Sequence, residues 1–86
     1  MNVLFYGDVL NYTNGEKSRD INDCSDIQSL AEKLGGYYGE RFFSYLFGNE
    51  TCFFLVNGKG IMLTGGLKTK LKPEDKIEIL PFVHAG

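Results

Sequence analysis

The chain has 86 residues, of which 43% are hydrophobic and 14% aromatic. This length suits a single domain, and the apolar content is high enough to build a core, which excludes an intrinsically disordered chain. Nine Lys and Arg residues face eleven Asp and Glu residues, for a net charge of −2, so a basic excess that would favour nucleic-acid binding is missing.

The N-terminal segment predicts two strands joined by a turn. Residues 3–6 open an apolar run of strand-forming residues, which predicts a first strand over residues 2–10. Asn14-Gly15 is a strong hairpin-turn signal, and the polar residues 16–21 are expected to form a second, shorter strand. Both faces of the first strand are apolar, which indicates a central strand or one that a partner covers.

A helix with one buried face is predicted next. The motif S-D-I-Q at residues 25–28 fits a capping box and predicts the helix start. Gly35-Gly36 is expected to end the helix. Aromatic-rich residues 39–47 then predict a short second helix or turn. Apolar residues at helical spacing would form the buried face of the first helix: Ile27, Leu30, Ala31 and Leu34.

The second half of the chain predicts two further strands. Pro81 cannot donate a ladder hydrogen bond, so the last strand should end near it. The order of strand, strand, helix, short helix, strand, loop and strand predicts an α+β sheet with the main helix across one face. The expected segments are a break at 49–50, a strand at 51–56, a turn at 57–60, a loop at 61–71, a turn at 72–75 and a strand at 76–80.

Two cysteines and one histidine are too few for a disulfide scaffold, an iron–sulfur cluster or a structural zinc site. We therefore expect reduced thiols in a cytoplasmic protein, with Cys52 in the core. Cys24 precedes the predicted helix, where a thiolate could be favoured. The N-terminus lacks the features of a signal peptide, and no apolar run approaches the roughly 20 residues of a membrane span, so no membrane partner is expected.

Three motifs follow one another in the second half of the chain: Val56-Asn57-Gly58, G-L-K-T-K-L at residues 66–71, and P-E-D-K-I-E-I-L-P-F-V at residues 73–83. This order resembles MoaD-type sulfur carriers, whose pattern is V-N-G, G-L-x-T-x-L, D-G-D-x-V-x-I and a final P-P-V-x-G-G. The strand at residues 3–7 and G-E-R-F at residues 39–42 extend the resemblance over nearly the whole chain. ThiS-type carriers and ubiquitin-like modifiers share the fold, but the long segment 39–48 favours a MoaD-like chain.

The resemblance implies one β-grasp domain over residues 1–86, with a mixed sheet, a main helix across one face, a short second helix and a flexible tail from about residue 81. It also implies a sulfur carrier. An adenylating enzyme of the E1-like, MoeB/ThiF type would use ATP to activate the Gly86 carboxylate, and a sulfur donor protein would convert it to a thiocarboxylate. A MoaE-like large subunit would use this sulfur in molybdopterin (Mo/W cofactor) biosynthesis. The chain would bind no cofactor and no metal, and would be the non-catalytic small subunit of that complex.

The resemblance assigns the activated carboxylate to Gly86, next to Ala85 and His84. The family ends in Gly-Gly, and Ala85 adds a methyl group and loses the positive-φ conformations of Gly. The His84 imidazole is a candidate for assisting proton movement beside the thiocarboxylate. Phe82 replaces the second Pro of the family pattern. The residues expected at a partner interface are Tyr6, Ile61, Leu80 and Phe82.

Two other functions remain open. The chain could be a ubiquitin-like modifier that forms isopeptide bonds through Gly86. It could also be a β-grasp interaction module without activation chemistry, for which Ala85 is the best argument. The glycines at 58–60 and 65–66 do not match the Walker pattern and are expected to form turns. The surface lysines of the second half are interpreted as solubilising: Lys59, Lys68, Lys70, Lys72 and Lys76.

Overall fold

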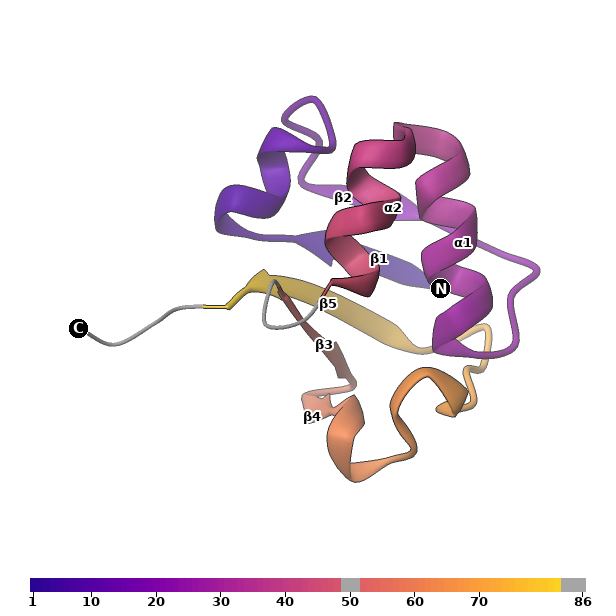
Figure 1. Cartoon of the computed structure of the whole chain (residues 1–86). Helices are drawn as coiled ribbons and strands as arrows, with labels where there is room; N and C mark the ends of the chain where they lie inside the picture. The colour runs from indigo at the N-terminus through magenta and orange to yellow at the C-terminus, as the bar shows by residue number, and fades with distance from the viewer. Residues whose placement is uncertain (49–51, 83–86) are drawn as a thin grey trace.

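The computed structural model of the chain describes residues 1–48 and 52–82. Two helices cover one face of a five-stranded sheet (Figure 1). In chain order the strands and helices are β1 (Asn2–Phe5), β2 (Ser18–Asp20), α1 (Ile27–Tyr38), α2 (Glu40–Phe47), β3 (Cys52–Val56), β4 (Lys59–Gly60) and β5 (Lys76–Pro81). Three short 3-10 helices connect them: η1 (Gly7–Asn11), η2 (Ile61–Leu63) and η3 (Gly66–Lys68).

The sheet is mixed, with the strand order β2-β1-β5-β3-β4. The last strand, β5, lies in the centre, parallel to β1 and antiparallel to β3. The parallel register pairs Val3 with Ile77 and Phe5 with Ile79, so these four side chains lie on the same face. The α+β architecture with the main helix across one face is confirmed.

The core lies between this face and the two helices. All four predicted apolar positions of α1 are fully buried, and α2 adds Phe42 and Leu46. Each of the buried Ile, Leu and Phe side chains contributes roughly 1.5–3 kcal/mol when it is withdrawn from water. The face of α1 that the helical spacing predicted is therefore the face that packs on the sheet.

Both ends of α1 differ from the prediction. The N-cap is Asp26, whose carboxylate accepts a hydrogen bond from the Ser29 backbone N–H at 2.8 Å, while the Ser29 hydroxyl accepts one from the Asp26 N–H at 3.3 Å. The capping box thus starts one residue later than predicted, because Ser29 rather than Gln28 occupies the third helical position. The hydrogen bond from the Ser29 backbone N–H to the Asp26 carboxylate lowers the pKa of Asp26.

The prediction that Gly35-Gly36 ends α1 is wrong, because the helix continues to Tyr38 and stops at Gly39, where φ is +106°. Gly35 is buried against α2: a Cβ at this position would lie 2.8 Å from the Cβ and Cδ2 of Phe43. Gly36, in contrast, has nothing within 4 Å of its Cβ position. Gly35 is therefore a contact point between two helices rather than a helix end.

The first strand is shorter than predicted. It ends at Phe5, because Gly7 turns the chain at φ +56° into η1. A Cβ on Gly7 would lie 2.9 Å from Cγ of Pro81, so this turn lies against the end of β5. The rest of the predicted strand becomes η1, which contributes the buried Val9 to the core.

Several other predicted elements are confirmed with small changes. Asn14 and Gly15 both have positive φ in the turn before β2, and β2 itself covers only three residues. The turn at residues 72–75 is closed by a hydrogen bond from the Asp75 N–H to the Lys72 carbonyl. The predicted loop at 61–71 contains η2 and η3. The predicted break at 49–50 and Thr51 lie outside the described residues.

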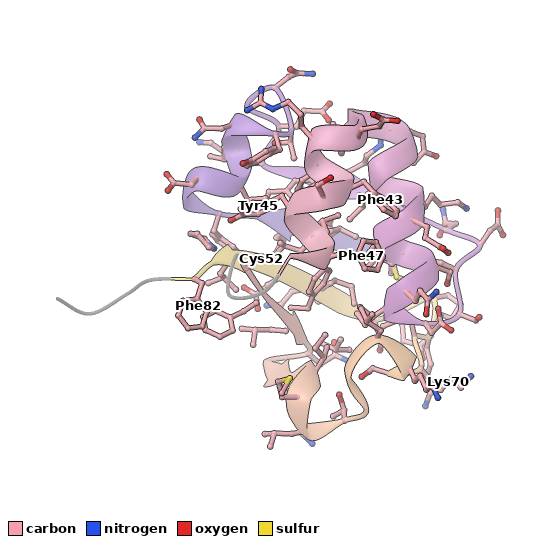
Figure 2. The ribbon with its side chains drawn as sticks, viewed as in Figure 1. Phe43, Tyr45, Phe47, Cys52, Lys70 and Phe82 are labelled. Atoms are coloured by element: carbon pink, nitrogen blue, oxygen red, sulfur yellow. The ribbon has the colours of Figure 1, made fainter. Side chains whose placement is uncertain are left out.

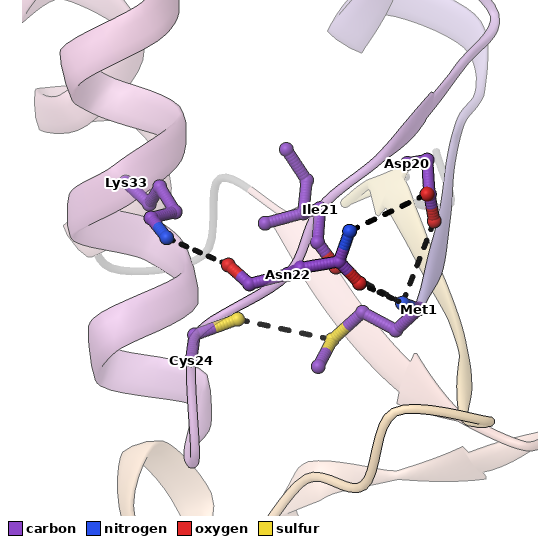
Figure 3. A network of polar contacts seen from close by, with 6 residues as sticks. All are labelled: Met1, Asp20, Ile21, Asn22, Cys24 and Lys33. Carbon is purple, nitrogen blue, oxygen red and sulfur yellow. Dashed lines mark hydrogen bonds and ion pairs between the residues drawn. The ribbon is translucent and has the colours of Figure 1, made fainter.

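Figure 3 shows the segment that joins β2 to α1, held by polar contacts. The N-terminal ammonium of Met1 donates to the Ile21 carbonyl at 3.0 Å, and Lys33 Nζ donates to the Asn22 carbonyl at 2.6 Å. The thiol of Cys24 lies 3.9 Å from the Met1 sulfur. Burial raises the pKa of Cys24, so a thiolate is not favoured at this position. Cys52 is partly buried and packs against the core. Within residues 1–48 and 52–82, no helix is both long and apolar enough to span a bilayer.

The two adjacent glycines of α1 give a matched test of the α1–α2 contact. We predict that Gly35→Ala lowers the free energy of unfolding by about 1–3 kcal/mol, because the new methyl group overlaps Phe43. Gly36→Ala should raise it by about 0.5–1 kcal/mol, because Ala favours the helix and its methyl group meets nothing. Denaturant unfolding measures both, and an equal effect of the two substitutions would contradict the close contact.

Candidate functional site

The face of the sheet opposite the helices is apolar, and no helix in the described part of the chain covers it (Figure 1). Its residues alternate along the strands with those of the core. Phe53 is 46% exposed and Tyr6 is 39% exposed, so large apolar surfaces meet solvent here. We call this surface the open face, and its apolar side chains are Leu4, Tyr6, Phe53, Leu55, Leu80 and Phe82.

A carboxylate lies in the middle of the open face. Glu78 is in register with Leu4 on one side and Leu55 on the other. Its side chain is only 19% exposed, and the Lys76 ammonium lies 4.0 Å away. The Tyr6 hydroxyl donates a 2.8 Å hydrogen bond to Glu78. This hydrogen bond to the carboxylate is the main reason why the pKa of Tyr6 is raised, so the phenol stays protonated and its ring is held over the sheet.

The described chain leaves the sheet at a stacked aromatic pair. The rings of Phe53 and Phe82 lie 4.9 Å apart at an interplanar angle of 27°. Figure 2 shows the Phe82 ring at the end of β5, on the side away from the helices. Pro81 still belongs to β5, opposite Cys52, so the strand extends into the region where the tail was predicted to begin. The stacked pair therefore sets the direction of the chain just before residues 83–86.

The structure brings together three of the four predicted interface residues. Tyr6, Leu80 and Phe82 lie on the open face around Phe53. Ile61 does not join them, because it begins η2 and packs partly against the core. The predicted tail residues, Gly86, Ala85 and His84, lie outside the described residues.

Phe53 and Glu78 were not among the interface residues predicted from the sequence. Phe53 stands in the uninterrupted apolar run C-F-F-L-V, in which periodicity does not separate the two faces. The charged residue Glu78 in the alternating pattern of β5 was a usable signal, because its partners in the register are apolar. A partly buried carboxylate between apolar neighbours needs partners, and Tyr6 and Lys76 supply them.

The open face is a candidate surface for a partner, and its polar groups include the Tyr6 hydroxyl, the Glu78 carboxylate and the Lys76 ammonium. In the described ranges, no three His, Cys, Asp or Glu side chains gather into a possible metal site. Gly65 lies in a turn, as expected, whereas Gly66 begins η3, and both have positive φ. The four residues after Phe82 would reach about 13 Å if extended. The arrangement therefore suits a protein that docks through this face of its sheet.

Comparisons with known proteins identify the family of the chain and its fold. The model of the ThiS family matches residues 3–86, whereas no curated protein matches the sequence. A chain of the BexX/CysO complex from Amycolatopsis orientalis superposes with a TM-score of 0.81 at 20% identity, covering 99% of this chain and 98% of that one. Small archaeal modifier protein 1 (SAMP1) from Methanosarcina acetivorans has a TM-score of 0.78 at 24% identity, with coverage of 99% and 94%.

A third similar structure is a Pyrococcus furiosus protein provisionally named molybdopterin converting factor, subunit 1. Its TM-score is 0.71 at 19% identity, and the match covers 95% of each chain. At these identities the likenesses establish the fold, and the predicted β-grasp is confirmed.

The hydrogen bond between Tyr6 and Glu78 has a measurable consequence. We predict that Glu78→Gln lowers the pKa of Tyr6 toward the ordinary value of about 10, because the neutral amide stabilises the phenol less and no longer repels the phenolate. NMR titration of the tyrosine ring carbons measures this pKa. Burial raises the pKa of Tyr45 to about 12, and Tyr45 serves as the internal control. An unchanged Tyr6 pKa would show that Glu78 does not hold this ring.

Proposed function

The chain belongs to the ThiS family of β-grasp sulfur carriers and ubiquitin-like proteins, and from this premise we propose that Gly86 is its reactive residue. In the proposed reaction the Gly86 carboxylate attacks the α-phosphate of ATP on a partner enzyme, which releases pyrophosphate and forms an acyl-adenylate. Hydrosulfide from the sulfur donor then attacks the acyl carbon and displaces AMP, which leaves a thiocarboxylate on Gly86 with no change of oxidation state.

The observation that carries this proposal is the family match, which runs through to Gly86. Phe82 is stacked on Phe53 at the edge of the open face. A partner that covers the open face would therefore contact the chain at Phe82, four residues before Gly86. Gly at the last position leaves the carboxylate without a Cβ beside it, so a nucleotide can approach it closely.

We propose an adenylating enzyme of the E1-like type as the first partner, with the open face as its docking surface. An exposed apolar surface on a folded chain is typical of a protein interaction site. Tyr6, Leu80 and Phe82 would supply the contacts predicted from the sequence, and Phe53 would add the most exposed ring of the open face. Ala85 and His84 would enter the active site of that enzyme with Gly86.

For the sulfur acceptor we propose a precursor of molybdopterin, bound to a MoaE-like large subunit. Two observations support this choice. The ordered motifs of residues 56–83 resemble MoaD-type carriers, and the P. furiosus protein named as a molybdopterin converting factor shares the fold over 95% of this chain. In this role the chain would be the non-catalytic small subunit.

A second candidate function is protein modification. It is favoured by the similarity to SAMP1, a protein named as a modifier, at a TM-score of 0.78. The same acyl-adenylate of Gly86 would then be transferred to a lysine amine of a target protein, with loss of AMP and formation of an isopeptide bond.

Mass spectrometry tests the activation step. After incubation with the adenylating enzyme of the host, ATP and a sulfur donor, we predict replacement of one oxygen by sulfur on Gly86. Because oxidation of Met or Cys gives nearly the same mass change, fragmentation must place the change on the last residue. The Ala85→Gly variant, which restores the family ending, is the control. An unmodified native chain beside a modified Ala85→Gly variant would show that the native chain is an interaction module without activation chemistry.

The docking surface has its own test. We predict that Phe53→Ser weakens binding to the adenylating enzyme at least tenfold, because interface aromatic rings of this kind contribute about 2 kcal/mol or more. Tyr37→Ser is the matched control, since Tyr37 is 53% exposed but lies on α1, away from the open face. Isothermal titration measures both affinities. Equal weakening by the two substitutions would argue against the open face as the docking surface.

A further inference from the structure

A second surface with a distinct chemical character lies beside η2 and η3. A hollow of about 450 Å³ is lined by four lysines, Lys59, Lys68, Lys70 and Lys72. All four are exposed. We call them the lysine rim. Figure 2 shows Lys70 and Phe82 on opposite sides of the molecule, so the lysine rim is separate from the end of β5.

The charge of the chain is strongly divided. Residues 59–76 carry five of the nine cationic side chains but only two of the eleven carboxylates. The rest of the chain is acidic, with four cations against nine carboxylates. A net charge of −2 therefore hides one concentrated basic surface. Among residues 1–48 and 52–82, no carboxylate lies within 4.0 Å of any of the four ammonium groups of the lysine rim.

The floor of the hollow does not suit a small anion. The hydroxyls of Thr64 and Thr69 bond to each other at 3.0 Å. The two carboxylate oxygens of Asp75 accept hydrogen bonds from Asn57 Nδ2 and from the Lys72 backbone N–H, both at 2.8 Å. These groups already satisfy one another, and Asp75 adds a negative charge that would repel an anion inside the hollow. Attraction is therefore confined to the rim.

We propose that the lysine rim docks an acidic surface of a partner protein. Each solvated ammonium contributes little by itself, so useful binding needs several carboxylates that reach the rim together. The residues that line the hollow include neither arginine nor an aromatic ring. Forked phosphate contacts and base stacking, on which single-stranded nucleic-acid recognition depends, are thus missing from this surface.

The neighbouring side chains support a protein partner. Met62 and Leu63 of η2 are 88% and 86% exposed, directly before Thr64 at the hollow. Apolar contacts beside a charged rim match the usual composition of a protein interface. Because the rim and the end of β5 lie on opposite sides, a partner bound here leaves the Phe53–Phe82 end of the open face accessible. The proposal therefore does not depend on any chemistry of Gly86.

The test compares two double variants of the full chain. The first is Lys68→Glu with Lys70→Glu. The second is Lys17→Glu with Arg41→Glu. It makes the same charge change at two exposed cations, one directly before β2 and one in α2. The probe is a short poly-glutamate peptide, followed by amide NMR. We expect shifts in residues 59–72 and at least tenfold weaker binding by the rim variant, with the control variant within twofold of the native chain. Lys68→Gln with Lys70→Gln gives a milder change if the reversed charges disturb folding.

Three results would overturn the proposal. One is the absence of peptide-induced shifts in residues 59–72. Another is equal weakening by the two double variants, which would indicate a general charge effect. The third is tighter binding of tripolyphosphate, a single-stranded oligonucleotide or anionic phospholipid vesicles than of the peptide, which would assign the rim to a small anion, a nucleic acid or a membrane surface instead.

Discussion

The parallel pairing of β1 with β5 places the last strand of the chain in the centre of the sheet, between β1 and β3. Parallel neighbours cannot be joined by a tight turn, so the chain must cross the sheet before it returns. Helices α1 and α2 join β2 to β3 across one face of the sheet. They bury this face, with Ile77 and Ile79 beneath them. Because β5 is held on both sides, the chain just before its last residues has a fixed position and direction.

The open face follows from the same arrangement. The strands have apolar residues on both faces, but helices cover only one of them. Phe53, Leu55 and Leu80 stay on the uncovered side, and Phe82 stacks on Phe53 where β5 ends. Glu78 places a negative charge at the centre of this apolar surface. The hydrogen bond that it accepts from Tyr6 orients the Tyr6 ring. The proposed docking surface and the end of β5 therefore lie in one region of the molecule.

The sequence pattern was sufficient for the elements whose signals are local. The apolar spacing from Ile27 to Leu34 identified the buried helix face, and Asn14-Gly15 identified a turn. It failed where a glycine is required by tertiary contact: Gly35 allows α2 to approach, and Gly7 turns against Pro81, which no local pattern reveals. The site was predicted in part, since Tyr6, Leu80 and Phe82 meet on one face. Ile61 was separated from them by the turn into η2, and Phe53 was hidden in a run that is apolar on both faces.

Activation of the Gly86 carboxylate is the claim on which the proposed function depends, and ATP–pyrophosphate exchange tests it before any sulfur chemistry occurs. The adenylating enzyme of the host is incubated with ATP and labelled pyrophosphate, with the native chain or with a chain that lacks Gly86. We predict that label enters ATP only when the native chain is present, because formation of the acyl-adenylate is reversible. Absence of exchange with the native chain, while the Ala85→Gly variant supports it, would contradict the account.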